Sequence, residues 1–238
     1  MSVSLEWVGL ACFRLWEDGK PTIAMDPYTP SALGLPGDDD FRLKAGTVIA
    51  SSLTDRGHSY VELVEGNPRV IDALAVAEGR DNAVINGEPL ITVKAAEAED
   101  HPEGADDNAL YAFKAGGLWF LHMGDLGYEL DADQLAPFIG RCDVLLAIVG
   151  ERLTLKLHEL EPMLDILKPK WIFPMHYYLP PVKGNMVSAS EFIRRHQRNP
   201  IFYVRHHTVT FPIPKSADGR AVIVVLEPSG YQPESFLY

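Results

Sequence analysis

The chain has 238 residues, 47% of them hydrophobic and 23% charged, so it can bury a sizeable core without disulfide or metal staples. Its formal net charge of -12 at pH 7 argues against nonspecific nucleic-acid binding, because such binding depends on phosphate neutralisation by Lys and Arg. No apolar run approaches membrane-spanning length and the N-terminus lacks a signal-peptide pattern, so we expect no membrane partner. Cys12 and Cys142 flank apolar strand-like residues, as buried free thiols would. We therefore expect a cytoplasmic chain.

Strand signals dominate the first half of the chain. Residues 4–16 are rich in aromatic and β-branched side chains, and residues 21–25 return after a turn at 18–20, so the two segments together predict a hairpin. Residues 46–51 predict a buried strand, and residues 60–65 predict one or two helical turns. Further strands are predicted at three places within 69–93, separated by turns at 78–79, 81–82 and 86–87, and as a hairpin of 109–114 with 118–122.

Helices and strands alternate in the second half. Apolar residues at helical spacing predict a helix over 157–167, and Ser188 followed by Glu191 predicts a helix that begins with a capping box. The other predicted elements are a helix at 131–139 capped by Asp131 and strands at 142–149, 171–174, 201–212 and 220–227. Two β-rich blocks, each followed by helices, predict two sheets packed face to face with helices outside.

Three short segments each follow a strand-like run and end in a potential metal ligand: SSLTDRGH at 51–58, HMGD at 122–125 and FPMH at 173–176. Together with WVGLACF at 7–13 and IAMDPY at 23–28, they resemble the metal loops and the opening hairpin of the metallo-β-lactamase fold. The branch concerned contains predicted metal-dependent hydrolases, including sugar-lactone and acyl hydrolases. The resemblance runs from about Leu5 to about Pro180. It implies an α/β (α+β) fold class, a four-layer αββα sandwich in a single domain over 1–238.

The first loop departs from the family's pattern, which reads His-x-His-x-Asp-His after a strand. Aligned on its last histidine, the chain has Leu53, Asp55, Gly57 and His58 at those places. The family takes another histidine from a later loop, where this chain has Glu99, with His101 two residues away. The resemblance therefore implies that the three-histidine metal site is absent here.

The second metal site of the family keeps three of its four ligands. Its positions are Gly57, His58, Asp125 and His176 in this chain. Two histidines and one carboxylate with open positions are enough for a catalytic zinc or a non-haem iron. The resemblance therefore implies one divalent metal, with zinc favoured, manganese or iron as alternatives, and a metal-free site as the remaining alternative.

The vacated first site leaves two interpretations open. Asp55 and Glu99 could hold a harder ion in an oxygen-rich second site, since carboxylates prefer such ions. Alternatively, the Arg56 guanidinium could neutralise these carboxylates and replace the missing ion's charge. His101 and Tyr177 are further pocket candidates.

The remaining histidines are weaker candidates for the site. We interpret His122 as lying behind the site or in the core. We expect His158, His196, His206 and His207 to be structural.

The reaction implied by the resemblance is hydrolysis of an ester, lactone or amide in a small-molecule substrate. In that reaction Asp125 orients a water molecule and accepts its proton, while His58 and His176 hold the ion. The alternative is a non-catalytic member of the fold that binds a ligand or partner. The aromatic tail at 236–238 is expected to dock on its own chain or on a neighbour, which leaves a homo-oligomer open.

Overall fold

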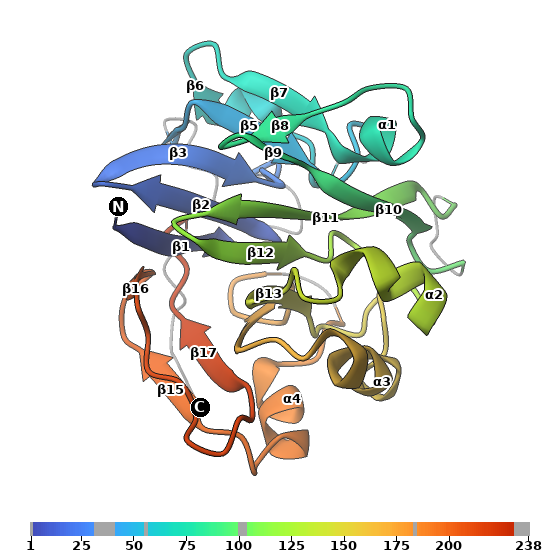
Figure 1. The fold of residues 1–238 in the computed structure, drawn as a ribbon, viewed down its shortest axis with the longest axis vertical. Coiled ribbons are helices and arrows are strands. Elements are labelled where there is room, and N and C mark those ends of the chain that lie inside the picture. The colour runs from blue at the N-terminus through green and yellow to red at the C-terminus, as the bar shows by residue number, and fades with distance from the viewer. Residues whose placement is uncertain (1, 31–40, 55–56, 100–103, 183–184, 231–238) are drawn as a thin grey trace.

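Two β-sheets dominate the computed structural model, which describes residues 2–30, 41–54, 57–99, 104–182 and 185–230 (Figure 1). The six-stranded sheet has the order β16-β1-β2-β3-β5-β7, and the seven-stranded sheet has the order β10-β11-β12-β13-β14-β17-β15. The strands of the first sheet are β1 (Val3–Gly9), β2 (Cys12–Glu17), β3 (Lys20–Met25), β5 (Thr47–Ala50), β7 (Arg69–Asp72) and β16 (Thr208–Phe211). Those of the second are β10 (Ile91–Ala96), β11 (Asp107–Ala115), β12 (Leu118–His122), β13 (Val144–Ile148), β14 (Trp171–Met175), β15 (Ile201–Val204) and β17 (Val222–Leu226).

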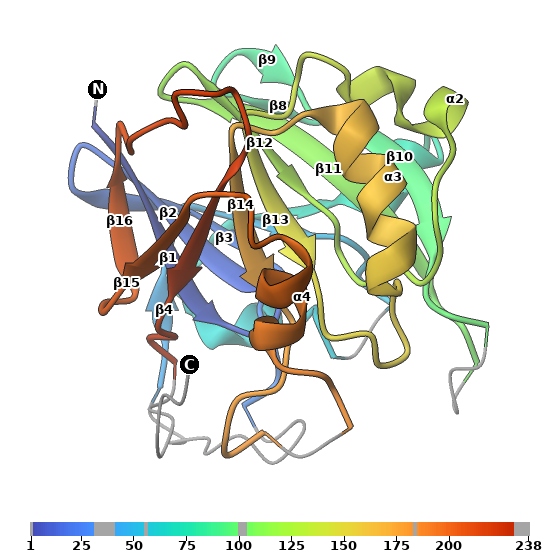
Figure 2. The same ribbon diagram turned by 90° about the horizontal axis from the view of Figure 1, so that it is seen from below.

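Helices and two short strand pairs complete the described part of the chain. The strand pairs are β4 (Leu43–Lys44) with β6 (Val64–Glu65), and β8 (Val84–Ile85) with β9 (Glu88–Pro89). The helices are α1 (Ala73–Ala77), α2 (Ala132–Leu135), α3 (Leu157–Leu167) and α4 (Ala189–Arg195), with 3-10 turns η2 (Val61–Leu63) and η3 (Ala136–Phe138). Helices α2, α3 and α4 gather on the side of the seven-stranded sheet that faces away from β1, β2 and β3 (Figures 1 and 2). The predicted α/β (α+β) class is confirmed.

Strand alternation explains how the six-stranded sheet packs on both faces. Successive side chains of a strand point to opposite faces. In β2, Phe13 and Leu15 join the main core between the sheets, whereas Cys12 belongs to a smaller cluster on the other face. Strand β5 divides in the same way, with Ile49 in the main core and Val48 in the smaller cluster.

Strand β13 is different, because all five of its residues are buried. It lies between parallel neighbours β12 and β14. Parallel strands covered on both faces read as continuous apolar runs, which is why this segment was predictable from sequence.

The prediction of one strand over 4–16 is wrong. The segment forms two strands, β1 and β2, separated by Leu10 and Ala11. Leu10 has a left-handed backbone (φ 49), and its carbonyl accepts hydrogen bonds from the Trp7 indole at 3.0 Å and the His176 backbone N–H at 3.1 Å. These partners hold a turn that local propensity does not favour.

The prediction of three strands within 69–93 misses a helix. Strand β7 is present, but Ala73–Ala77 form α1, which Asp72 caps by accepting a hydrogen bond from the Leu74 N–H at 3.1 Å. Three alanines favour a helix in this segment.

The prediction of one strand over 201–212 is also wrong. Strand β15 pairs with β17 in the second sheet, whereas β16 pairs with β1 in the first. The exposed turn between them, at 205–207, carries the chain from one sheet to the other.

The helix predictions hold to different degrees. The predicted bounds of α3 are confirmed. The helix expected over 131–139 begins at the Asp131 cap but continues as η3 after Leu135, because Pro137 has no N–H to extend α2. Ser188 caps α4 as predicted, yet the capping box is wrong, since Glu191 pairs with Arg194 instead.

The main core includes residues from both ends of the described chain, from Val3 to Leu226. A single domain over 1–238 remains a prediction, and the tail at 236–238 lies outside the described residues. No helix in the described ranges has the length and apolar character needed to cross a membrane. Cys12 and Cys142 are free and buried, which confirms the expectation for the thiols.

The C-terminus of α3 allows a test of the steric cost of a left-handed backbone. Lys168 is exposed and adopts a left-handed conformation (φ 48, ψ 55). Because glycine adopts this conformation without steric cost, Lys168→Gly should stabilise the fold by roughly 0.5–1 kcal/mol. Chemical denaturation measures the change, and Lys168→Ala, which keeps the steric cost, should bring no gain. A lower stability of Lys168→Gly would contradict this account of the helix end.

Candidate metal centre

Three loops bring His58, Asp125 and His176 together. Asp125 follows β12 and His176 follows β14, two strands that run parallel with β13 between them, so their carboxyl ends lie at one edge of the sheet. His58 lies on the loop after β5 of the other sheet. The three residues are buried, with exposed fractions of 5%, 6% and 7% in chain order.

The ligand atoms of these residues lie within metal-binding reach of one another. His58 Nε2 is 2.6 Å from Asp125 Oδ2, and His176 Nε2 is 3.7 Å from Asp125 Oδ1. The two imidazole rings have centroids 5.1 Å apart. One ligand atom from each residue falls within 4.8 Å of the other two. Both imidazoles therefore direct a nitrogen at the same carboxylate.

The electrostatics of the site favour the forms that bind a metal. Burial acts to raise the pKa of the Asp125 carboxyl, but His58 and His176 outweigh this and hold that pKa well below its usual range. Burial lowers the pKa of His176, against the opposing effect of Asp125. Near pH 7 Asp125 is therefore ionised and His176 is neutral. Metal ligation requires these forms.

One buried atom of the cluster tests whether a cation fits. Asp125 Oδ1 has no hydrogen-bond partner among the described residues. A buried carboxylate oxygen without a donor is costly unless a cation or water meets it. Two imidazoles and one carboxylate also form the donor set of catalytic zinc and of non-haem iron sites. These residues fit a divalent metal.

The backbone at His176 is strained and is held by close contacts. His176 has a left-handed φ of 53, and its N–H donates to the Leu10 carbonyl at 3.1 Å. Gly150 lies so close that a Cβ there would sit 1.9 Å from the His176 carbonyl oxygen. A left-handed non-glycine residue costs about 1–2 kcal/mol. Such strain persists where surrounding contacts fix it, often at functional sites.

The other predicted site residues do not join this cluster within the described chain. Glu99 is exposed, and Leu53, at the position of a lost histidine, is 42% exposed. Tyr177 is 3% exposed and its ring packs against Trp7 with centroids 5.1 Å apart, so it contributes to the core. Its role at the pocket remains a prediction. Asp55, Arg56 and His101 lie outside the described residues.

The histidines expected to be structural occupy different environments. His158, His206 and His207 are exposed, and His196 packs against Phe192 with centroids 4.4 Å apart. His122 is fully buried behind Asp125, as interpreted from the sequence. Asp26 and Tyr111, which lie beside it, were not predicted from the sequence. An Asp-Pro pair directly after a strand was the available signal for Asp26.

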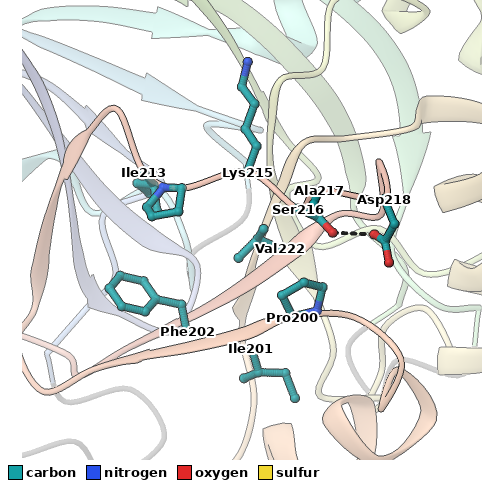
Figure 3. A pocket seen from close by; sticks show the side chains of 10 residues that line it. Pro200, Ile201, Phe202, Ile213, Lys215, Ser216, Ala217, Asp218 and Val222 are labelled. Atoms are coloured by element: carbon teal, nitrogen blue, oxygen red, sulfur yellow. Dashed lines mark hydrogen bonds between the residues drawn. The ribbon is translucent and has the colours of Figure 1, made fainter.

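A cavity lies at the end of β14 opposite to His176. It has a volume of about 570 Å³ and is lined mainly by apolar residues such as Ile201, Phe202 and Val222 (Figure 3). Its Asp218 is hydrogen-bonded to Ser216 and Arg220. Asp218 is exposed and pairs with Arg220, which lowers its pKa and makes it a poor base for Ser216, so we place the chemistry at the histidine cluster.

Comparison with known proteins matches this architecture. The sequence profile described as a beta-lactamase superfamily domain matches residues 4–176. The chain belongs to this superfamily. A UPF0173 protein of Pyrococcus abyssi is 26% identical over 191 residues, which cover 74% of this chain and 83% of that protein. A UPF0173 metal-dependent hydrolase of Pyrococcus furiosus is 33% identical over 76 residues, covering 32% of this chain and 34% of that protein.

Solved structures are also similar to this superfamily member. A Thermotoga maritima structure, named as a candidate Zn-dependent hydrolase of the metallo-beta-lactamase superfamily, superposes with a TM-score of 0.67 at 28% identity. The superposition covers 94% of this chain and 98% of that one. The predicted metallo-β-lactamase type of fold is confirmed.

Gly124, which precedes Asp125, provides a test of the loop. It has φ +56, and a Cβ there would lie 2.3 Å from Asn108 Oδ1 and 2.8 Å from the Ser51 Cβ. Gly124→Ala in this superfamily member should therefore lower the free energy of unfolding by roughly 2–5 kcal/mol, from backbone cost plus overpacking. Gly87→Ala is the matched control, because Gly87 has φ +84 but nothing within 4 Å, and it should lose about 1–2 kcal/mol. Equal losses in urea denaturation would contradict close packing at Gly124.

Proposed function

We propose that the chain is a hydrolase that depends on one divalent metal held by His58, Asp125 and His176. The observation that carries this proposal is the buried convergence of two imidazoles on one ionised carboxylate, with ligand atoms within 4.8 Å. The names of two relatives support it, since the Pyrococcus furiosus protein is called a metal-dependent hydrolase and the Thermotoga maritima structure a candidate Zn-dependent one. Zinc suits this donor set best, with manganese or iron as alternatives.

A divalent ion bound here supplies Lewis acidity and lowers the pKa of a bound water towards neutrality. The chain's own contribution centres on Asp125. Its Oδ1 has no hydrogen-bond donor among the described residues, which makes it the oxygen able to orient a water molecule and accept its proton. His176 stays neutral through burial and so keeps a lone pair for ligation. The low exposure of all three residues excludes bulk water.

The proposed substrate is a small molecule with an ester, lactone or amide bond. Attack of an activated water on an acyl carbon is the chemistry that one Lewis-acid centre with an adjacent carboxylate supports. Cytoplasmic location stays part of the proposal, supported by the buried free thiols of Cys12 and Cys142.

One metal is proposed because the other family site lacks ligands. Leu53 has no coordinating atom, and Glu99 is exposed and lies outside the ligand cluster found among the described residues. A two-metal centre would need ligands that these positions do not offer.

Metal content tests the proposal directly. Protein stripped with a chelator and titrated with Zn²⁺ should take up about one equivalent, because three ligands converge at one place. His176→Ala should weaken this uptake by at least about tenfold, since it removes a ligand. His158→Ala, an exposed change on α3, should match the parent. Uptake of two tight equivalents, or of none, would refute the one-metal proposal.

Gly57→Asp tests whether the missing fourth ligand limits affinity. The added carboxylate brings both charge and geometry, so isothermal titration should show tighter Zn²⁺ binding than in the parent. In the alternative function, a binding scaffold whose carboxylates are neutralised by Arg56, neither protein would bind metal. Absence of uptake in both would therefore favour the scaffold.

A further inference from the structure

A buried polar network lies behind the candidate ligands, and its members come from two strands and from the residue that follows a third. Asp26 follows β3, Tyr111 lies in β11 and His122 ends β12, and each has an exposed fraction of 0%. Their side chains do not belong to the ligand cluster. Buried polar groups of this kind are expensive unless they bond to one another or to the backbone. Each of these three makes such bonds.

The first part of the network reaches the loop of His58. Asp26 Oδ1 accepts hydrogen bonds from the Ser51 backbone N–H at 2.8 Å and from the Tyr111 hydroxyl at 3.0 Å. Burial raises the pKa of Tyr111, so its hydroxyl stays protonated and donates. Ser51 directly follows β5 and begins the loop that leads to His58. Asp26 thus fixes the start of that loop.

The second part of the network reaches Asp125. His122 pairs with Tyr111 across β11 and β12, and their rings stack with centroids 5.0 Å apart and planes 3° apart. The Gly124 backbone N–H donates to His122 Nδ1 at 2.9 Å, so this nitrogen carries no proton. Gly124 is the residue before Asp125. The orientation of the His122 ring therefore sets the start of the Asp125 loop.

The third part reaches His176. Since Nδ1 is an acceptor, the ring donates through Nε2, to the Ala11 carbonyl at 2.8 Å. Ala11 follows Leu10, whose carbonyl accepts the His176 N–H at 3.1 Å. One imidazole in one tautomer thus spans the segments that hold Asp125 and His176.

We infer that Asp26, Tyr111 and His122 are positioning residues that set the mutual distances of His58, Asp125 and His176. The inference rests on the proposed metal binding, because these distances matter for ligation. Groups that orient first ligands through hydrogen bonds commonly change metal affinity about 10- to 100-fold when lost. Tyr111 and Asp26 act on the His58 loop, and His122 acts on the other two ligands.

Tyr111→Phe tests the inference because it removes one hydroxyl and keeps the ring stacked on His122. The matched control is Phe113→Leu, in the same strand and equally buried, which changes packing but no polar contact of the network. Both variants should melt at a lower temperature than the parent. Only Tyr111→Phe should bind Co²⁺ about tenfold more weakly and shift the visible absorption bands of the Co²⁺ complex.

His122 variants give a second, independent test. His122→Ala should weaken Co²⁺ binding, and His122→Asn, which keeps an acceptor near the Gly124 N–H, should recover part of the affinity. Wild-type affinity and absorption bands in both Tyr111→Phe and His122→Ala would overturn the positioning role while leaving the metal-dependent function intact. Failure of the parent to bind Co²⁺ or Zn²⁺ would overturn both.

Discussion

Compensation of the buried Asp125 charge is the constraint on which the rest of the site depends. The carboxylate is ionised while only 6% of the residue is exposed. A charge in such surroundings costs several kcal/mol unless donors or cations meet it. His58 provides one contact at 2.6 Å, and His176 provides a weaker one at 3.7 Å. The fold must therefore deliver both histidines to the same sheet edge, from loops far apart in the sequence.

Parallel strand pairing in the two sheets places these loops at the same edge. Strands β12, β13 and β14 run in one direction, so the loops after β12 and β14 leave at the same edge. Strand β5 runs parallel to β3 in the facing sheet, and the Ser51 N–H bonds to Asp26 directly after them. Successive side chains of β2 and β5 are buried on opposite faces, so this sheet packs on both faces. Ligand placement is thus a consequence of strand direction.

Sequence patterns predicted the parts of this arrangement that depend on local residues. The bounds of α3 follow from its apolar spacing, and the three ligand loops follow strands recognisable by composition. The turn at Leu10 was not predictable, because its hydrogen-bond partner His176 lies in a distant segment. Likewise, the division of 201–212 between two sheets depends on the pairing of β16 with β1. The polar role of Tyr111 arises from its register opposite His122 and its contact with Asp26, which no single segment encodes.

The cluster of His58, Asp125 and His176 does not depend on the positions of Leu53 and Glu99 for its support. Asp125 and His176 are fixed by His122, Ala11 and Leu10, and none of these contacts involves Leu53 or Glu99. The 2.6 Å separation of His58 Nε2 and Asp125 Oδ2 is that of a hydrogen bond, and both atoms are of the kind that a divalent cation takes as ligands. The same carboxylate charge that makes the site costly to bury also attracts a cation to it.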